Sequence, residues 1–268
     1  MTNIGRFTAV LLVGMAAGLV AAGSSTTARQ TAARTVVIAE LFTSEGCSSC
    51  PAADDLLRRL IATQPLEGVE IIALGHHVDY WDRLGWRDPF SSPLFSARQS
   101  SYAGAVFGSD RIYTPQLIVD GAVEVIGSDE PAVRQTLTKA ASRPKAIVRV
   151  VVVEEPQRRA RVNVQVEVPA NLPTRGTADI VIAVAEDGLA SHVSLGENKG
   201  RTLSHSAVVR SLTTAGHLNA GQGATSASSV VTLGSDWNTA NLRIVAFVQE
   251  QTSRRIIGGG FSPLRQDR

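Results

Sequence analysis

The order of strand-like and helix-like segments changes abruptly near Pro144, and this change constrains the fold more than any other feature of the sequence. Before Pro144, apolar runs rich in β-branched residues alternate with stretches whose apolar residues recur at helical spacing. The segments that we predict are 36–42 (strand), 47–61 (helix), 69–74 (strand), 94–107 (helix), 116–120 (strand), 122–126 (strand) and 128–142 (helix). This order is typical of an α/β layer fold with a mixed sheet.

From Lys145 onward, the sequence contains short strand-like runs and few helical patterns. Turn residues, above all glycines, separate the predicted strands, which are 146–155, 160–168, 178–186, 203–212, 229–233, 242–249 and 255–260. Short strands at this spacing are typical of a β-sandwich. We therefore predict an α/β plus β fold: a mixed sheet with flanking helices over residues 35–143, followed by a β-sandwich-like region over residues 144–264.

The N-terminal segment has the plan of a secretory signal peptide. Arg6 gives it a positive charge, an apolar run follows over residues 7–22, and small residues lie at its end. The run is about 16 residues long, which is shorter than the roughly 20 residues that a membrane-spanning helix needs. We predict a signal peptide over residues 1–23, a flexible leader over 24–34 and a periplasmic or secreted protein without a membrane span after cleavage. An uncleaved N-terminal anchor is the alternative.

Charge and cysteine content narrow the possible functions. Lys and Arg total 26 against 24 Asp and Glu, and no basic run is dense enough to follow a phosphate backbone, so we expect no nucleic-acid partner. The chain has only 2 Cys, which excludes a disulfide-rich scaffold and a four-cysteine zinc site.

Both cysteines fall in the first turn of the helix predicted over 47–61, which follows the first predicted strand, in the sequence Cys47-Ser48-Ser49-Cys50. Thiols at this spacing can approach closely enough to form a disulfide. The N-terminus of a helix carries a positive partial charge that stabilises a thiolate. Cys47 is therefore the candidate nucleophile, and Cys50 is the candidate resolving cysteine.

Two other interpretations of the cysteine pair remain open. A structural disulfide that closes a loop of about four residues stabilises a chain by only about 2 kcal/mol in the chain-entropy model. Metal ligation is the other interpretation: His77 follows the second predicted strand and could join Cys47 and Cys50 in a site whose sulfur ligands suit Cu(I). The simpler interpretation is that His77 is a loop histidine that only forms hydrogen bonds.

Three further positions are candidates for the same site. Glu40 lies within the first apolar strand, where burial would raise its pKa and let it accept the Cys50 proton; a solvated strand end is the alternative. Thr114-Pro115 directly precedes a buried strand, and a cis bond there would let the Thr114 backbone pair with an extended substrate, although trans is the commoner isomer. Trp81 is a candidate substrate contact, with packing of residues 76–93 against the sheet as the alternative.

The β-rich half has one polar cluster of note, formed by residues 197–201 and His205. We assign this cluster to a turn and an outward-facing strand rather than to chemistry.

Several runs of the sequence carry a resemblance to known families. Glu40, the CSSC-Pro segment and Thr114-Pro115 resemble a thioredoxin-like domain. The runs ELFTSEGCSSCPAADDLL, HVDYWDRLGWRDPF, YTPQLIVDG and GENKGRTLSHSAVVR resemble the secreted family called domain of unknown function 1223. The resemblance implies a thioredoxin-like domain, a following β-rich region and export from a bacterial cell, and it implies no substrate.

Together these observations predict an exported thiol–disulfide oxidoreductase that needs no cofactor and whose partners are protein or small-molecule thiols and disulfides. In this hypothesis Cys47 attacks, Cys50 resolves, Glu40 moves the proton, and Thr114, Pro115 and Trp81 contact the substrate. A copper- or metal-binding protein, or a cell-envelope interaction protein on the same scaffold, is the alternative.

Overall fold

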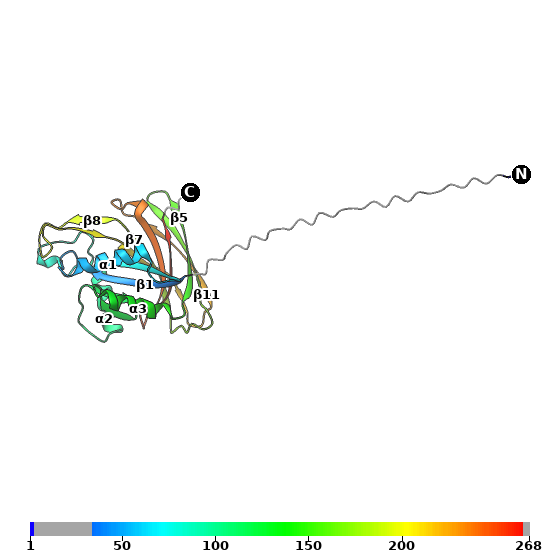
Figure 1. Cartoon of the computed structure of the whole chain (residues 1–268), viewed down its shortest axis with the longest axis horizontal. Coiled ribbons are helices and arrows are strands. Elements are labelled where there is room, and N and C mark those ends of the chain that lie inside the picture. The colour runs from blue at the N-terminus through cyan, green and yellow to red at the C-terminus, as the bar shows by residue number, and fades with distance from the viewer. Residues whose placement is uncertain (3–33, 265–268) are drawn as a thin grey trace. The chain divides into compact units, whose positions relative to one another are not determined.

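Eleven strands form one mixed sheet in the computed structural model, which describes residues 1–2 and 34–264 (Figure 1). The order across the sheet is β11-β6-β5-β13-β12-β7-β10-β2-β1-β3-β4. The strands are β1 (Thr35–Thr43), β2 (Val69–His77), β3 (Gln116–Val119), β4 (Val123–Ile126), β5 (Ala146–Glu155), β6 (Arg159–Glu167), β7 (Ala178–Glu186), β10 (Val208–Leu218), β11 (Ala224–Thr232), β12 (Leu242–Glu250) and β13 (Ile256–Pro263). The predicted signal peptide and leader lie almost wholly outside the described residues.

Three α-helices occur in the described part of the chain: α1 (Cys50–Thr63), α2 (Pro93–Ala105) and α3 (Glu130–Ala141). Each has a proline in its first turn, where the missing N–H costs nothing. The side chains of Ser92 and Asp129 cap α2 and α3 by accepting hydrogen bonds from backbone N–H groups. The helices lie beside the β1 part of the sheet in Figure 1, where α1 and α3 contact β1 and α2 contacts β2.

One strand pairing joins the two halves of the sequence. β1 and β2 are parallel, and β3 pairs antiparallel with β1. On the other side of β2 lies β10, a strand from the C-terminal half, with Val208 paired to Gly75. The Gly75 N–H donates to the Ala207 carbonyl at 2.7 Å. β10 then pairs antiparallel with β7, so that the remaining strands continue the same sheet.

The predicted fold class is therefore wrong. The described chain is not a thioredoxin-like α/β domain followed by a β-sandwich-like region, because eleven of its strands, from both halves of the sequence, form one mixed sheet that only three α-helices accompany. The individual strand patterns were strong, but a strand's sequence does not specify which strand will lie beside it. The pairing of β2 with β10 is what turns two expected sheets into one.

A second, two-stranded sheet stands apart from the main one. It consists of β8 (Leu189–His192) and β9 (Thr202–His205), joined by residues 193–201. The sequence predicts one strand over 203–212, but the backbone breaks after β9, and Ala207 adopts a φ of 55° before β10 begins. The described residues also include two short 3-10 helices, η1 (Asp82–Leu84) and η2 (Thr239–Asn241). None of the described helices has the length and apolarity needed to cross a membrane.

Candidate functional site

A disulfide joins Cys47 and Cys50 in the turn between β1 and α1, with their Cα atoms 5.4 Å apart. Cys50 is the first residue of α1, three positions later than the sequence predicts, so Cys47 lies in the turn that leads into the helix. The Cys50 N–H donates to the Cys47 carbonyl at 3.3 Å, and the Ser49 hydroxyl lies 3.3 Å from the Cys47 sulfur. The pair thus stands at a helix N-terminus, as expected.

The hairpin β8–β9 covers this turn. The Asn198 side-chain amide donates to the carbonyl oxygens of Glu45 and Cys47 at 2.8 and 2.9 Å. The Ser48 N–H donates to the Glu197 carboxylate at 2.9 Å, and hydrogen bonds from the Ser48 side chain and backbone lower the pKa of Glu197. Cys47 and Cys50 are only 1% and 0% exposed. Neither cysteine is therefore open to solvent in this conformation.

Five buried titratable side chains, one of them from the hairpin itself, form a cluster next to the disulfide turn. Its members come from the β1–α1 turn, α1, β2, the 76–93 connection and β9; they are Glu45, Asp54, His77, Asp88 and His205. The His77 Nδ1 lies 2.7 Å from an Asp88 carboxylate oxygen, and the His205 Nε2 lies 2.9 Å from a Glu45 carboxylate oxygen. The rings of His77 and His205 meet edge to face, 4.7 Å between centroids.

Burial and charge set the protonation of this cluster. Burial raises the pKa of Asp54 more than the nearby histidines lower it, so its pKa lies above the ordinary value. Burial alone would lower the pKa of His77, but Asp88 and the other carboxylates outweigh it and raise the pKa. Burial likewise would raise the pKa of Asp88, but His77 outweighs it and lowers the pKa. Burial thus dominates the pKa of Asp54, whereas the mutual attraction of His77 and Asp88 dominates at those two residues and favours their charged forms.

Asp54 also lies close to both the cysteine pair and solvent. It follows Cys50 by one turn of α1, so the two side chains lie on the same helix face. Its carboxylate accepts a hydrogen bond from the Thr43 hydroxyl at 3.1 Å and lies 3.8 Å from the His205 Nδ1, an atom without a hydrogen-bond partner in the described residues. A small cavity of about 130 Å³ between α1 and β9 reaches Asp54 and His205.

Glu40 lies in a different environment from the one predicted. It is fully buried on β1, and its carboxylate bonds to His76 Nε2 at 2.9 Å, to Arg98 Nε at 2.6 Å and to the Tyr102 hydroxyl. Burial alone would raise the pKa of Glu40, but Arg98 and His76 outweigh it and hold the pKa far below its usual range. The expectation of a raised pKa is thus wrong, and the described contacts of Glu40 do not include Cys50.

Trp81 connects the Thr114–Pro115 segment with the disulfide turn. The Thr114–Pro115 bond is cis, the isomer that base rates disfavour. The Trp81 indole N–H donates to the Thr114 hydroxyl at 2.9 Å. A Cβ added to Gly46, which directly precedes Cys47, would lie 3.0 Å from the Trp81 Cβ. Trp81 therefore packs between the Thr114–Pro115 segment and the cysteine turn.

The structure does not assemble the alternative metal site of Cys47, Cys50 and His77. The cysteines are bonded to each other, and the Nδ1 of His77 bonds to Asp88. Among residues 34–264, no group of three or more His, Cys, Asp or Glu side chains has the arrangement of metal ligands.

Five contributors to the site were not among the predicted site residues. Three of them, Glu45, Asp54 and Asp88, gave no distinctive signal, because isolated acidic residues near turns and helix starts are common. Asn198 and His205 belong to the polar cluster that we assigned to a surface turn and strand. The structure instead places both over the disulfide turn. The unusual concentration of polar residues in that β-rich segment was the sequence feature that could have indicated their part in the site.

Comparison with known proteins identifies relatives in sequence and in fold. Among proteins with curated descriptions, none matches this sequence. A crystal structure of an Agrobacterium tumefaciens protein matches with a TM-score of 0.64 and 24% identity, covering 87% of this chain and 96% of that one. HBP35 of Porphyromonas gingivalis matches with a TM-score of 0.65 and 16% identity, covering 86% and 76%. These identities demonstrate similarity of fold alone.

The family model described as protein of unknown function DUF1223 matches residues 38–249, which include the cysteine turn, the connection that carries His77 and Trp81, and the covering hairpin. The chain therefore belongs to the DUF1223 family.

Proposed function

We propose that Cys47 and Cys50 form a redox-active pair that exchanges with thiols and disulfides of other molecules. The observation that carries the proposal is a disulfide at the start of α1 placed beside a buried group of titratable side chains. Thiol–disulfide exchange requires protons to move to and from the sulfurs, and such a group can hold them. A purely structural disulfide would need no titratable neighbours. A disulfide that closes so short a loop stabilises the folded chain by only about 2 kcal/mol.

The exchange balances two electrons and two protons. A thiolate of a substrate dithiol attacks one sulfur of the Cys47–Cys50 disulfide and forms a mixed disulfide. The second substrate thiol then releases the enzyme cysteine, leaving an oxidised substrate and two cysteine thiols. In the reverse direction the Cys47 thiolate attacks a substrate disulfide, and Cys50 resolves the intermediate.

Asp54 is the group best suited to exchange a proton with Cys50. It follows Cys50 by one helical turn, and its raised pKa brings proton transfer closer to neutral pH. Glu40, by contrast, is held as a carboxylate by Arg98 and His76. Asp54 therefore replaces Glu40 in the proposed proton path.

Because both cysteines are buried, the proposal requires the hairpin β8–β9 to move away from the turn. This hairpin is a separate two-stranded sheet, so its displacement breaks no pairing of the eleven-stranded sheet. Isolated two-stranded hairpins are only marginally stable in water, which makes such a movement accessible. We also propose, from the signal-like N-terminus, that the protein works outside the cytoplasm.

The reduction potential of the cysteine pair tests the proposed function. The protein is equilibrated in glutathione or dithiothreitol buffers of graded potential, and free thiols are counted by alkylation and mass spectrometry. We expect a midpoint between about −270 and −120 mV, the range of working dithiol catalysts. A pair that stays oxidised in buffers below about −300 mV is a structural staple and contradicts the proposal.

A trapping experiment assigns the roles of the two sulfurs. Cys50→Ser leaves Cys47 as the free thiol, and Cys47→Ser leaves Cys50. We expect the Cys50→Ser variant to form a mixed disulfide with oxidised glutathione faster, because Cys47 lies in the turn outside the helix. Equal rates in the two variants would contradict the assignment of Cys47 as the nucleophile.

A further inference from the structure

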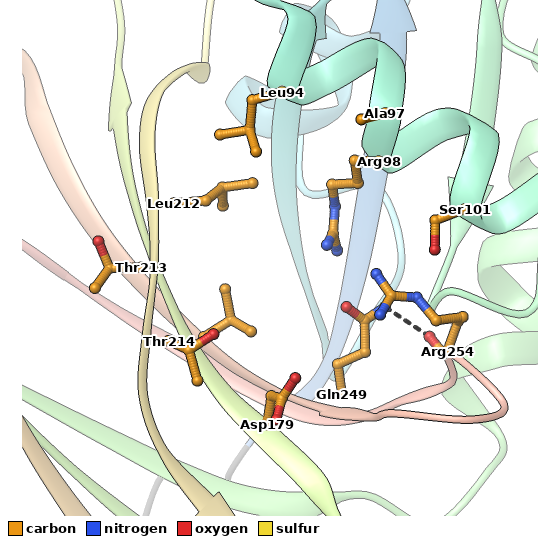
Figure 2. Close-up of a pocket in the computed structure, with 11 residues that line it drawn as sticks. Leu94, Ala97, Arg98, Ser101, Asp179, Leu212, Thr213, Thr214, Gln249 and Arg254 are labelled. Carbon is orange, nitrogen blue, oxygen red and sulfur yellow. Dashed lines mark hydrogen bonds between the residues drawn. The ribbon is translucent and has the colours of Figure 1, made fainter.

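The molecule has a second cavity whose lining does not include the cysteine turn. This cavity, of about 370 Å³, lies between α2, strands β7, β10 and β12, and the β12–β13 turn (Figure 2). Cavities of this size are typical of sites that hold small molecules. Both halves of the sequence contribute to it, because α2 precedes Pro144 and the strands follow it.

Two arginines line the cavity, and only one of them is neutralised. Arg98 donates to the Glu40 carboxylate at 2.6 Å. The Arg254 guanidinium lies 5.7 Å from the centre of the Tyr102 ring, and its side chain has no hydrogen bond or ion pair among residues 34–264. Its Nε atom is buried without a partner. Asp179 also lines the cavity, but its carboxylate accepts hydrogen bonds from His217 and Gln251 at 2.8 and 2.7 Å.

The backbone holds Arg254 firmly in this position. The Gln249 side-chain amide donates to the Arg254 carbonyl at 2.7 Å, as the dashed line in Figure 2 shows. A Cβ on Gly121 would collide with the same carbonyl, so the β3–β4 turn packs directly against it. Arg254 itself has a φ of 58°, a left-handed conformation that is unfavourable for a residue with a side chain. An arginine whose backbone is held in place, and whose guanidinium has no ion pair among residues 34–264, is suited to hold an anion that comes from outside.

The cavity is apolar at the end opposite Arg254. Figure 2 shows Leu94 and Leu212 lying together there, away from Arg254 and Gln249. Leu94 is 50% exposed, although it is a large apolar side chain. A ligand that places an aliphatic chain against these leucines would remove apolar surface from water.

We propose that this cavity binds a small carboxylate with an aliphatic chain. The carboxylate pairs with the guanidinium of Arg254, and the chain lies against Leu94 and Leu212. This site is independent of the cysteine pair, so its existence does not depend on the proposed redox function.

Calorimetric titration of the full chain with hexanoate tests the proposal. Hexan-1-ol and hexylamine are the matched probes, because they keep the chain and replace the carboxylate by a neutral or a cationic group. We expect hexanoate to bind at least tenfold more tightly than either. Equal affinity for hexanoate and hexan-1-ol would overturn the proposal.

Variants then locate the site. We expect Arg254→Gln to weaken hexanoate binding at least tenfold, whereas Arg87→Gln, which removes an exposed arginine that does not line the cavity, leaves it unchanged. Leu94→Ser changes an exposed residue and is the second variant in case Arg254→Gln does not fold. We expect Leu94→Ser to weaken hexanoate binding severalfold. Unchanged binding in either folded variant would overturn the proposal. The Cys47→Ser, Cys50→Ser double variant should bind hexanoate like the wild type, which separates this site from the redox function.

Discussion

The neighbours of Glu40, rather than its position in a strand, determine its charge. The sequence leaves open whether Glu40 is buried in the first strand or solvated at its end, and the structure buries it; a buried carboxylate can have a raised or a lowered pKa. The deciding partner is Arg98, which is 58 positions away in the chain and lies on α2. No local pattern links these two residues, so the direction of the pKa shift was not predictable from the sequence.

Glu40→Gln should destabilise the protein strongly at neutral pH. Arg98 would keep its buried charge without a counter-charge, which typically costs about 3–5 kcal/mol. Because the folded pKa of Glu40 is lowered, its stabilising effect is complete above the unfolded value of 4.5 and is lost as the pH falls through the folded pKa. Urea unfolding at pH 7 and pH 3 should therefore show a smaller difference from wild type at pH 3. Exposed Glu67→Gln is the control, and an equal loss at both pH values would contradict the assignment.

Asp54→Asn should have the opposite effect. Because burial raises the folded pKa of Asp54, its contribution to stability is complete below the unfolded value of 3.8 and is lost as the pH rises through the folded pKa. The neutral asparagine avoids this loss and can still accept the Thr43 hydrogen bond. We expect urea unfolding to show that the variant is more stable than wild type at pH 8 and that this advantage shrinks as the pH falls towards 4. A variant that is less stable than wild type at pH 8 would show that Asp54 is stabilised as a carboxylate.

At the scale of elements, the hairpin β8–β9 is hydrogen-bonded to the turn that carries the disulfide, and the proposed function requires it to move. Its strands are short, and its contacts with the cysteine turn are hydrogen bonds from polar side chains. The sequence did not predict β8 and merged β9 with β10, because both lie in a region of polar and turn-forming residues. A strand of four residues is too short for an alternation of apolar and polar residues to be recognised in the sequence.

Asn198→Ala should loosen this cover and speed reduction of the disulfide. The substitution removes two hydrogen bonds to the turn, each worth about 1 kcal/mol. If both break when the hairpin opens, the open population and the rate of reduction by dithiothreitol should rise about 30-fold. Lys199→Ala, an exposed neighbour on the same hairpin, is the control. Indistinguishable rates in Asn198→Ala and wild type would mean that the hairpin does not limit access.

Most other elements were predictable because their patterns are local. Strands β1, β2, β5 and β7 and helices α2 and α3 lie within two or three residues of the predicted positions. The cysteine pair was also predictable, since it depends on adjacent residues and a strand-to-helix change. What the sequence could not provide was the lateral order of strands, which depends on contacts between residues far apart in the chain.

At the scale of the whole molecule, the two halves of the sequence share a hydrophobic core. One cluster combines Ile38, Ile72 and Phe95 from before Pro144 with residues such as Val245 and Phe247 from after it. The sheet is continuous between β2 and β10 in the same region. If either half unfolded alone, the apolar side chains of the other half would be exposed to water, which is unfavourable in free energy.

We therefore expect one cooperative unfolding transition for residues 34–264. Differential scanning calorimetry of the intact chain should give a single peak whose calorimetric and van't Hoff enthalpies agree. Two resolved peaks would instead support separate domains over residues 35–143 and 144–264, as the sequence predicts.

The covering hairpin has a consequence for how the protein would behave among other thiols. A reduction potential measures the free-energy difference between two end states, whereas a cover changes only the barrier between them. A buried disulfide can therefore stay oxidised in a large excess of small thiols. It would be reduced only when a partner displaces the hairpin. Selectivity would then arise from which molecules can compete with Asn198 for the turn, and not from the driving force of the reaction.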